Sequence, residues 1–402
     1  MFDLLKGVRV IELAQWVMVP SASALLADLG ADVIKVEDPA VGDPYRGLRT
    51  AALADAGTGE SPSVAHTNRG KRSIGINVKH EQGRALLVDL LRTADVLLTS
   101  LRAPALSRLG LSPDDLREVN PGLIYARGNA FGAEGPDKDE PGYDSTAFWS
   151  RGGFAHSLTP RGARYPVQMR PALGDRTTAI ALAMGVASAL VKRERTGEGS
   201  VIDVSLLGTA SWVLAGDLLA ALHGVDPVQD PERSRTTNPL TNTYRTRDGR
   251  WINLVTMQAD RYWPSLCRVL GRIDLADDPR FVNAGVRAEN YDACVAALDE
   301  AFASADLEEW RCRFADFDGA WALVQGGLEV ISDPQVRANQ WIVELDGADP
   351  GTYAVAGPVR ASGGTPNLSR SPGIGEHTEE ILLELGRSWD EIIALKTTET
   401  IT

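Results

Sequence analysis

Short runs of β-branched and other apolar residues alternate with amphipathic segments along the first half of the chain. The opening predicts a strand at 8–13, a short apolar helix at 20–29 and a second strand at 32–37. The alternation continues, with strands expected at 73–78, 95–101 and 123–128 and helices at 81–93 and 113–119. Strands that alternate with helices in this way favour right-handed crossovers and a mainly parallel sheet.

The second half of the chain changes character. A long helix is expected from about 175 to 195, and it ends at a turn, 196–199, that contains two glycines. Residues 223–239 are polar and include three prolines, which predicts a linker or a surface loop. Beyond it, a strand at 251–257 and helices at 260–270 and 291–303 predict a smaller α+β unit from about 225 to 325.

The composition narrows the class of protein. Apolar residues make up 44% of the 402 residues and charged residues 24%, the balance of a folded globular protein. The net charge of -13 disfavours nucleic acid as a partner, because such binding requires phosphate neutralisation. The three cysteines show no close spacing, so a reducing, cytoplasmic setting is expected. Neither a signal peptide nor a membrane span is expected.

Residues 25–37, with the sequence LLADLGADVIKVE, are followed by Pro39, the pair Gly42 and Asp43, and Arg46. This segment resembles the N-terminal signature of the family III CoA transferases, which include formyl-CoA transferase and relatives that act as α-methylacyl-CoA racemases. Further motifs of that family follow in the same order, so the resemblance spans almost the whole chain. They lie at 68–74, 108–110, 120–121, 142–144, 173–175, 278–281, 333–336 and 375–378.

The resemblance implies a fold and an assembly. It implies an α/β fold with a large Rossmann-like, parallel-sheet domain at 1–224 that is completed by 326–402, a small α+β domain at 225–325, and a homodimer of interlocked rings. Acyl-CoA and a small carboxylic acid are the implied substrates. No G-x-G-x-x-G motif follows the first strand, which counts against NAD, and the five histidines lack metal-ligand spacing, so no metal is expected.

Asp175 is the residue that the resemblance implies as the acyl carrier, because it aligns with the catalytic aspartate of the transferases. A carboxylate can form first an anhydride and then a thioester, as transfer of CoA between two acids requires. From the sequence alone, a helix N-cap is the favoured interpretation of Asp175, since aspartate often precedes an apolar-periodic helix. The two roles are compatible, because a helix N-terminus favours an ionised carboxylate.

Tyr143 and Asp144 bear on the choice between transferase and racemase. The related racemases carry a histidine base at the position of Tyr143 and a glutamate where Asn242 aligns, and tyrosine, with a reference pKa of about 10, is a poor proton shuttle. The pair Tyr143 and Asp144 resembles the transferases, where the tyrosine could hydrogen-bond the reacting carbonyl. Two alternatives stay open, an α-methylacyl-CoA racemase-like epimerase and a non-catalytic acyl-CoA-binding protein.

CoA carries phosphates, so an acidic protein that binds it needs a local group of cations. The resemblance implies Arg69, Lys71, Arg72 and Arg108 for this role. Each of them is also consistent with an ordinary solvated surface charge. Gln15 stands where formyl-CoA transferase has a histidine near CoA, and it is expected to lie in the same site.

Overall fold

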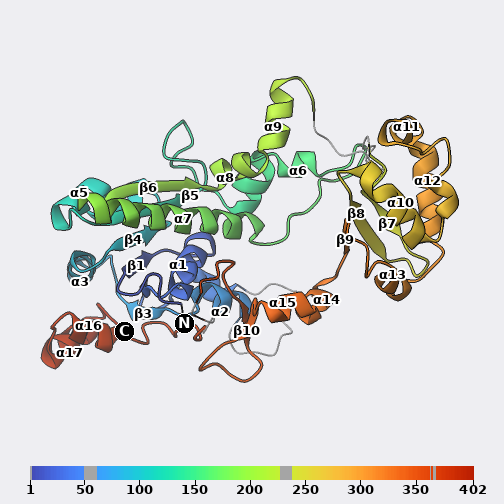
Figure 1. Ribbon diagram of the computed structural model, residues 1–402. Helices are drawn as coiled ribbons and strands as arrows, with labels where there is room; N and C mark the ends of the chain where they lie inside the picture. Colours follow the sequence, from blue (N-terminus) through green and yellow to red (C-terminus); the bar gives the residue numbers. More distant parts are fainter. Residues whose placement is uncertain (1, 49–60, 227–237, 363, 365–367) are drawn as a thin grey trace. The chain divides into compact units, whose positions relative to one another are not determined.

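The computed structural model describes residues 2–48, 61–226, 238–362, 364 and 368–402. The chain divides into two compact units (Figure 1). The larger unit comprises residues 1–159, 163–228 and 334–402, and the smaller unit comprises 160–162 and 229–333. One of the two main boundaries falls in the expected linker at 223–239, of which 227–237 lie outside the described residues.

The larger unit is built on a six-stranded sheet whose strand order is β3-β2-β1-β4-β5-β6. Every neighbouring pair in it is parallel. The order reverses direction between β1 and β4, and in open α/β sheets ligands bind outside the carboxyl ends of the strands at such a point. The strands are β1 (Arg9–Leu13), β2 (Asp32–Glu37), β3 (Arg72–Gly75), β4 (Val96–Thr99), β5 (Ile124–Asn129) and β6 (Ser200–Ser205).

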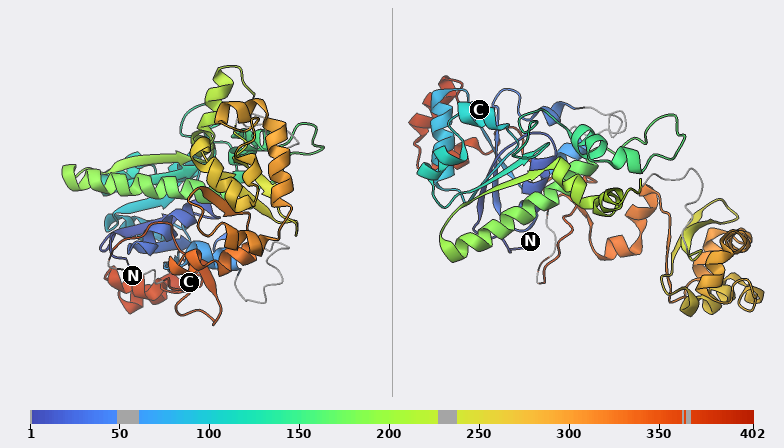
Figure 2. Two further views of the ribbon diagram at one scale, coloured as in Figure 1. Left: turned by 45° about the vertical axis from the view of Figure 1, so that its right-hand side comes forward. Right: turned by 90° about the horizontal axis from the view of Figure 1, so that it is seen from above.

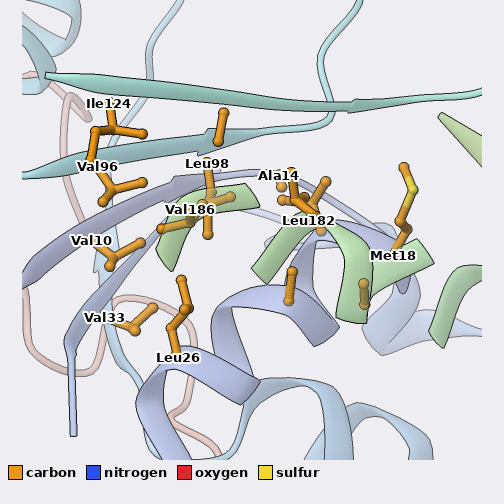
Figure 3. Packing of buried hydrophobic residues seen from close by; sticks show 14 of the residues in the cluster. Val10, Ala14, Met18, Leu26, Val33, Val96, Leu98, Ile124, Leu182 and Val186 are labelled. Atoms are coloured by element: carbon orange, nitrogen blue, oxygen red, sulfur yellow. The ribbon is translucent and has the colours of Figure 1, made fainter. Parts of the chain in front are cut away.

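Helices α1 (Met18–Asp28) and α7 (Leu173–Thr196) pack together over one face of this sheet (Figure 3). Strand side chains such as Val10, Val96 and Ile124 meet Leu26 of α1 and Leu182 of α7 in one buried cluster. Figure 2 shows α7, in light green, lying along the sheet beside β5 and β6. The long α7 therefore has its N-terminus fixed relative to the strand ends.

The opposite face of the sheet is covered by helices from both ends of the chain. Ile11 and Leu97 point to this face and join a second buried cluster with Leu90 of α3, Leu116 of α5 and Ile381 of α16. Arg72 on β3 also forms ion pairs with Glu380 and Glu384 of α16. The covering helices are α3 (Glu81–Arg92), α5 (Pro113–Val119), α16 (Thr378–Glu384) and α17 (Trp389–Thr397).

The remaining elements of the larger unit are short. They are α2 (Pro62–Asn68), α4 (Ala103–Arg108), a π-helix η2 (Asp144–Arg151), a 3-10 turn η1 (Pro44–Gly47), α6 (Phe154–Ser157), α8 (Leu206–Val213), α9 (Ala215–Leu222), α15 (Pro334–Ala338) and the hairpin of β10 (Ile342–Glu344) with β11 (Tyr353–Val355). The sequence pattern does not predict helices α8 and α9. Their outer faces carry exposed apolar side chains, which obscures helical periodicity.

The smaller unit is an α+β structure with its own core. An antiparallel sheet of β7 (Thr241–Arg245), β8 (Trp251–Val255) and β9 (Ala320–Leu323) packs against helices, with Tyr244, Phe302 and Trp310 fully buried. The helices are α10 (Ala259–Leu270), η3 (Ile273–Leu275), α11 (Ala284–Glu289), α12 (Tyr291–Phe302), α13 (Leu307–Arg313) and α14 (Gly327–Ser332). In neither unit does a described helix have the length and apolar character needed to cross a membrane.

Candidate active site

Asp175 lies in the first turn of α7, as the third residue of the helix. The N-cap is Ala172, which holds a left-handed backbone with φ of 64°, and no side chain makes a capping hydrogen bond there. The N-cap interpretation of Asp175 is therefore wrong by three positions. Gly174 allows the close packing of this turn, because a Cβ at that residue would meet Cγ of Phe148 at 2.5 Å.

Asp144 begins the π-helix η2 and lies against the same helix end. Burial raises the pKa of Asp144, and the backbone amides of Ser145, Ala172 and Asp175, which lie near its carboxylate, oppose this rise without cancelling it. Its Oδ2 atom is buried and has no hydrogen-bond partner among the described residues. π-helical turns occur often at functional sites, and this one places a carboxylate directly beside Asp175.

Burial of Asp175 raises its pKa to about 7, and the negative charge of Asp144 adds to the rise. Arg176 opposes both effects but does not cancel them. A pair of neighbouring carboxylates in which one pKa is raised toward neutrality is typical of a catalytic site, although structural pairs also occur. Asp175 is consequently divided between its protonated and ionised forms near neutral pH.

Tyr143 is exposed and stands edge-on to Trp16, with ring centroids 5.8 Å apart. Trp16 follows β1 and has a positive φ of 71°, a strained conformation for a bulky residue. Its backbone N–H donates to Oδ1 of Asp43 at 3.1 Å, and Asp43 is itself held by Lys35 Nζ at 2.9 Å. A buried ion pair thus fixes the strained turn that supports Tyr143.

A cavity of about 440 Å³ brings several of these side chains together. We call it the Asp175 cavity. It lies where the sheet changes direction, at the ends of β1, β4 and β5, and three cationic residues, Arg102, Arg127 and Lys138, line it. The other lining residues include Gln15, Trp16, Gly142, Tyr143 and Asp175.

A second cavity, of about 380 Å³, lies at the carboxyl ends of β1 and β2 and after β3 and β4. We call it the strand-end cavity. Gln15, Leu101 and Ala105 line both cavities, so the two adjoin. Arg108 and Lys79 supply the cations of the strand-end cavity, and neither forms an ion pair within the described residues. A long ligand with an anionic end could extend from one cavity to the other.

Comparison with known proteins settles the family. The model of CoA-transferase family III matches residues 5–378. The chain belongs to CoA-transferase family III. It is accordingly an enzyme of the CoA-transferase type, and enzymes of this type use CoA thioesters as substrates.

Several relatives of this transferase match over nearly its full length. The (R)-2-hydroxy-4-methylpentanoate CoA-transferase of Clostridioides difficile is 31% identical over 99% of both chains. The cinnamoyl-CoA:phenyllactate CoA-transferase of Clostridium sporogenes is 33% identical over 98% of this chain and 96% of its own. The crystal structure of a CAIB/BAIF family protein from Brucella suis superposes with a TM-score of 0.81, at 31% identity over 96% of this chain and 100% of its own.

The structure does not bring three of the expected CoA-binding cations to either cavity of the transferase. Lys71 is buried, and its Nζ lies 2.7 Å from Oε2 of Glu12, which also holds Lys35. Arg69 is buried in an ion pair with Asp28 at 2.6 Å. Both side chains are engaged in buried ion pairs, and their role in CoA binding stays a prediction.

Arg72 is the third of these cations. It forms ion pairs with Asp32, Glu380 and Glu384 and so holds helix α16 against the sheet. Of the basic residues expected from sequence, Arg108 alone lines one of the two cavities, and Gln15 lines both. The three cations of the motif at 68–74 thus take part in ion pairs within the larger unit.

Sequence reasoning missed Lys79, Lys138 and Trp16 as site residues. Lys79 follows the third strand, and Lys138 lies five residues before Tyr143. Both therefore lie in loops that follow strands, which could be seen from the sequence. Ligand-binding loops follow the carboxyl ends of parallel strands, and this rule would have selected both residues. Trp16 gave no signal, because its strained backbone is visible only in three dimensions. No group of three potential metal ligands occurs among the described residues.

Proposed function

We propose that this transferase moves CoA from an acyl-CoA donor to a carboxylic acid, with Asp175 as the carrier. The ionised Asp175 carboxylate attacks the donor thioester carbonyl, the C–S bond breaks, and an acyl-aspartyl anhydride and CoA thiolate result. The thiolate then attacks the aspartyl carbonyl of the anhydride. The C–O bond breaks, the donor acid leaves as its carboxylate, and an aspartyl-CoA thioester remains.

The second half of the proposed reaction reverses these steps with the acceptor. The acceptor carboxylate attacks the aspartyl carbonyl of the thioester. CoA thiolate leaves, and a new mixed anhydride between the acceptor and Asp175 remains. The thiolate attacks the acceptor acyl carbon, so the product acyl-CoA leaves and the Asp175 carboxylate is restored. Tyr143, which lines the Asp175 cavity, is positioned to donate a hydrogen bond to an oxyanion that develops there.

The observation that carries this proposal is the position of Asp175. Its carboxylate lines a cavity that adjoins the strand-end cavity through Gln15, Leu101 and Ala105. We infer that the nucleotide end of CoA occupies the strand-end cavity near Arg108 and Lys79, and that the pantetheine arm leads past Gln15 to the carboxylate. The phosphates thereby meet cations, and the thioester meets the nucleophile.

Transfer is tested by incubating the protein with an acyl-CoA and a panel of carboxylates and measuring the new thioester by mass spectrometry. The expected result is CoA transfer to at least one acid, and a loss of several orders of magnitude in Asp175→Asn, because an amide cannot form the anhydride. Deuterium exchange at the α-carbon without CoA transfer would support a racemase instead. Tight CoA binding without any thioester exchange would support a binding protein.

We further propose a homodimer of interlocked rings in which 326–402 returns to the domain formed by 1–224, while 225–325 forms the small domain. Exposed apolar side chains on α8 and α9 support a protein partner at that surface: Trp212 is 82% exposed, Leu222 80% and Leu219 60%. A cytoplasmic setting is consistent with the free thiols of Cys267 and Cys294.

Light scattering should give twice the 43.2 kDa chain mass, without dissociation on dilution. Trp212→Asp is expected to impair assembly, whereas Trp389→Asp, at an exposed tryptophan on α17, should not. A monomer mass for the wild type would contradict the proposal.

A further inference from the structure

A third cavity, of about 760 Å³, lies beside the carboxylate pair and has no role in the mechanism above. Asp144 lines it, and the preceding residue, Tyr143, lines the Asp175 cavity together with Asp175. The two cavities therefore approach the reacting carboxylate through neighbouring residues. We call the third one the Trp149 cavity.

The wall of the Trp149 cavity is built by tertiary contacts. The indole of Trp149 stacks on Phe154, with ring centroids 5.7 Å apart, and its Nε1 donates to the carbonyl oxygen of Val167 at 3.0 Å. The backbone N–H of Val167 in turn donates to Oγ1 of Thr159 at 3.0 Å. These bonds hold the segment around Val167 against the π-helix, so the cavity has a defined wall.

The chemistry of the Trp149 cavity differs from that of the Asp175 cavity. Trp149, Pro166, Val167 and Met169 give it apolar surface, and among its lining residues the titratable side chains are Asp144 and His156. Neither lysine nor arginine lines it among the described residues, whereas Arg102 and Lys138 line the Asp175 cavity together with Arg127, which is paired with Asp203. His156 Nε2 lies 2.9 Å from Oδ1 of Asp226, so a second carboxylate would enter the Trp149 cavity without a lysine or arginine partner, and its desolvation would be unfavourable.

We propose that the Trp149 cavity binds the side chain of the acceptor acid and selects monocarboxylic acids with a bulky apolar substituent over dicarboxylic acids. This assignment rests on the proposed function. In this arrangement CoA reaches Asp175 through the Asp175 cavity, which is lined by cations. The acyl substituent extends past Asp144 into the Trp149 cavity, which lacks lysine and arginine. The volume lies within the range of about 300–1,000 Å³ that is usual for small-ligand sites.

The test compares acceptors with acetyl-CoA as the donor. Wild-type protein should use 4-methylpentanoate and 3-phenylpropanoate with a kcat/KM at least about tenfold above that for succinate or glutarate, since a few buried methylene groups are enough for such discrimination. Val167→Trp fills the cavity from an exposed position. It should raise the KM for 4-methylpentanoate about tenfold while the KM for acetyl-CoA changes less than about twofold. Val282→Trp, at an exposed valine of the smaller unit, is the matched control and should leave both constants unchanged.

Gln168→Arg gives an independent test. It adds a guanidinium to the cavity wall and should move the preference toward succinate, because the second carboxylate gains a partner. If the wild type transfers CoA to none of these acids, the proposed function itself fails. If it uses dicarboxylates as well as apolar acids, or if neither variant changes the acceptor preference, transfer stands and the assignment of the cavity is overturned.

Discussion

Asp144 of η2 lies beside Asp175 in the first turn of α7, and its charge helps to raise the pKa of Asp175 to about 7. One acid thus changes the protonation of its neighbour. A nucleophile with this pKa gains reactivity as the pH rises through neutrality, because only the ionised carboxylate can attack the thioester.

The dependence of activity on pH follows from this pair. We expect kcat/KM for acyl-CoA to increase up to a pH of about 7 and to level off above it. Asp144→Asn removes the charge that raises the pKa of Asp175, so the acidic limb should move to lower pH. Initial rates between pH 5.5 and 8.5 measure the effect. If the acidic limb of the pH profile lies at the same pH in both proteins, the charge of Asp144 does not raise the pKa of Asp175.

The same pKa predicts a pH-dependent gain in stability for Asp175→Asn. Folding raises the pKa of Asp175 from 3.8 to about 7, so the wild type loses stability as the pH rises between these values. Asparagine carries no charge and avoids that loss. Thermal unfolding should show a larger gain in Tm for the variant at pH 8 than at pH 5.5. An equal gain at both pH values, or a loss at pH 8, would argue against a buried, destabilised carboxylate.

Gly174 is expected to be essential for placing Asp175. Gly174→Ala introduces a Cβ that meets Phe148 at 2.5 Å, and overpacking of this kind costs about 1–3 kcal/mol. The variant should lose stability and also kcat, because the helix end must shift. Gly327→Ala, at a helix start with open space around it, is the control and should leave both unchanged. Normal kcat in Gly174→Ala would show that this packing does not position the nucleophile.

The basic residues separate into binding and structural groups. Arg108→Gln should raise the KM for acyl-CoA about tenfold with little change in Tm, because it removes one charge-assisted contact to a phosphate. Lys71→Met leaves the buried Glu12 with Lys35 as its remaining cationic partner, and breaking a buried pair costs about 3–5 kcal/mol. Its Tm should fall, and the KM of the folded fraction should not change. An unchanged Tm together with a raised KM for acyl-CoA in Lys71→Met would indicate that Lys71 binds CoA.

The sequence was sufficient for the order along the chain of the six strands of the main sheet and of helices α1, α3, α5 and α7. The β-branched runs at 8–13 and 32–37 contain β1 and β2, because a buried parallel strand needs apolar side chains on both faces. The expected strand at 73–78 is longer than β3, which ends at Gly75, and Ile76 then pairs with Ile401 in an isolated bridge. A contact with the C-terminus cannot be read from local pattern.

The candidate site was predictable only in part. Asp175, Asp144 and Tyr143 were identified by resemblance, and the structure places Asp144 against Asp175. The partners of Arg69, Lys71 and Arg72 were not predictable, since a cation paired with Asp28 or Glu12 has the same local sequence as one that faces solvent. Ion pairing depends on distances in the folded chain, and the local sequence does not contain these distances.

Trapping of the acyl carrier tests the central claim most directly. Wild-type protein is incubated with acyl-CoA, treated with hydroxylamine and digested, and the peptides are analysed by mass spectrometry. An anhydride or thioester on Asp175 would be converted to an aspartyl hydroxamate. The account predicts this modification on Asp175, its dependence on acyl-CoA, and its absence in Asp175→Asn. A hydroxamate on Asp144 instead, or none at all in a protein that transfers CoA, would contradict it.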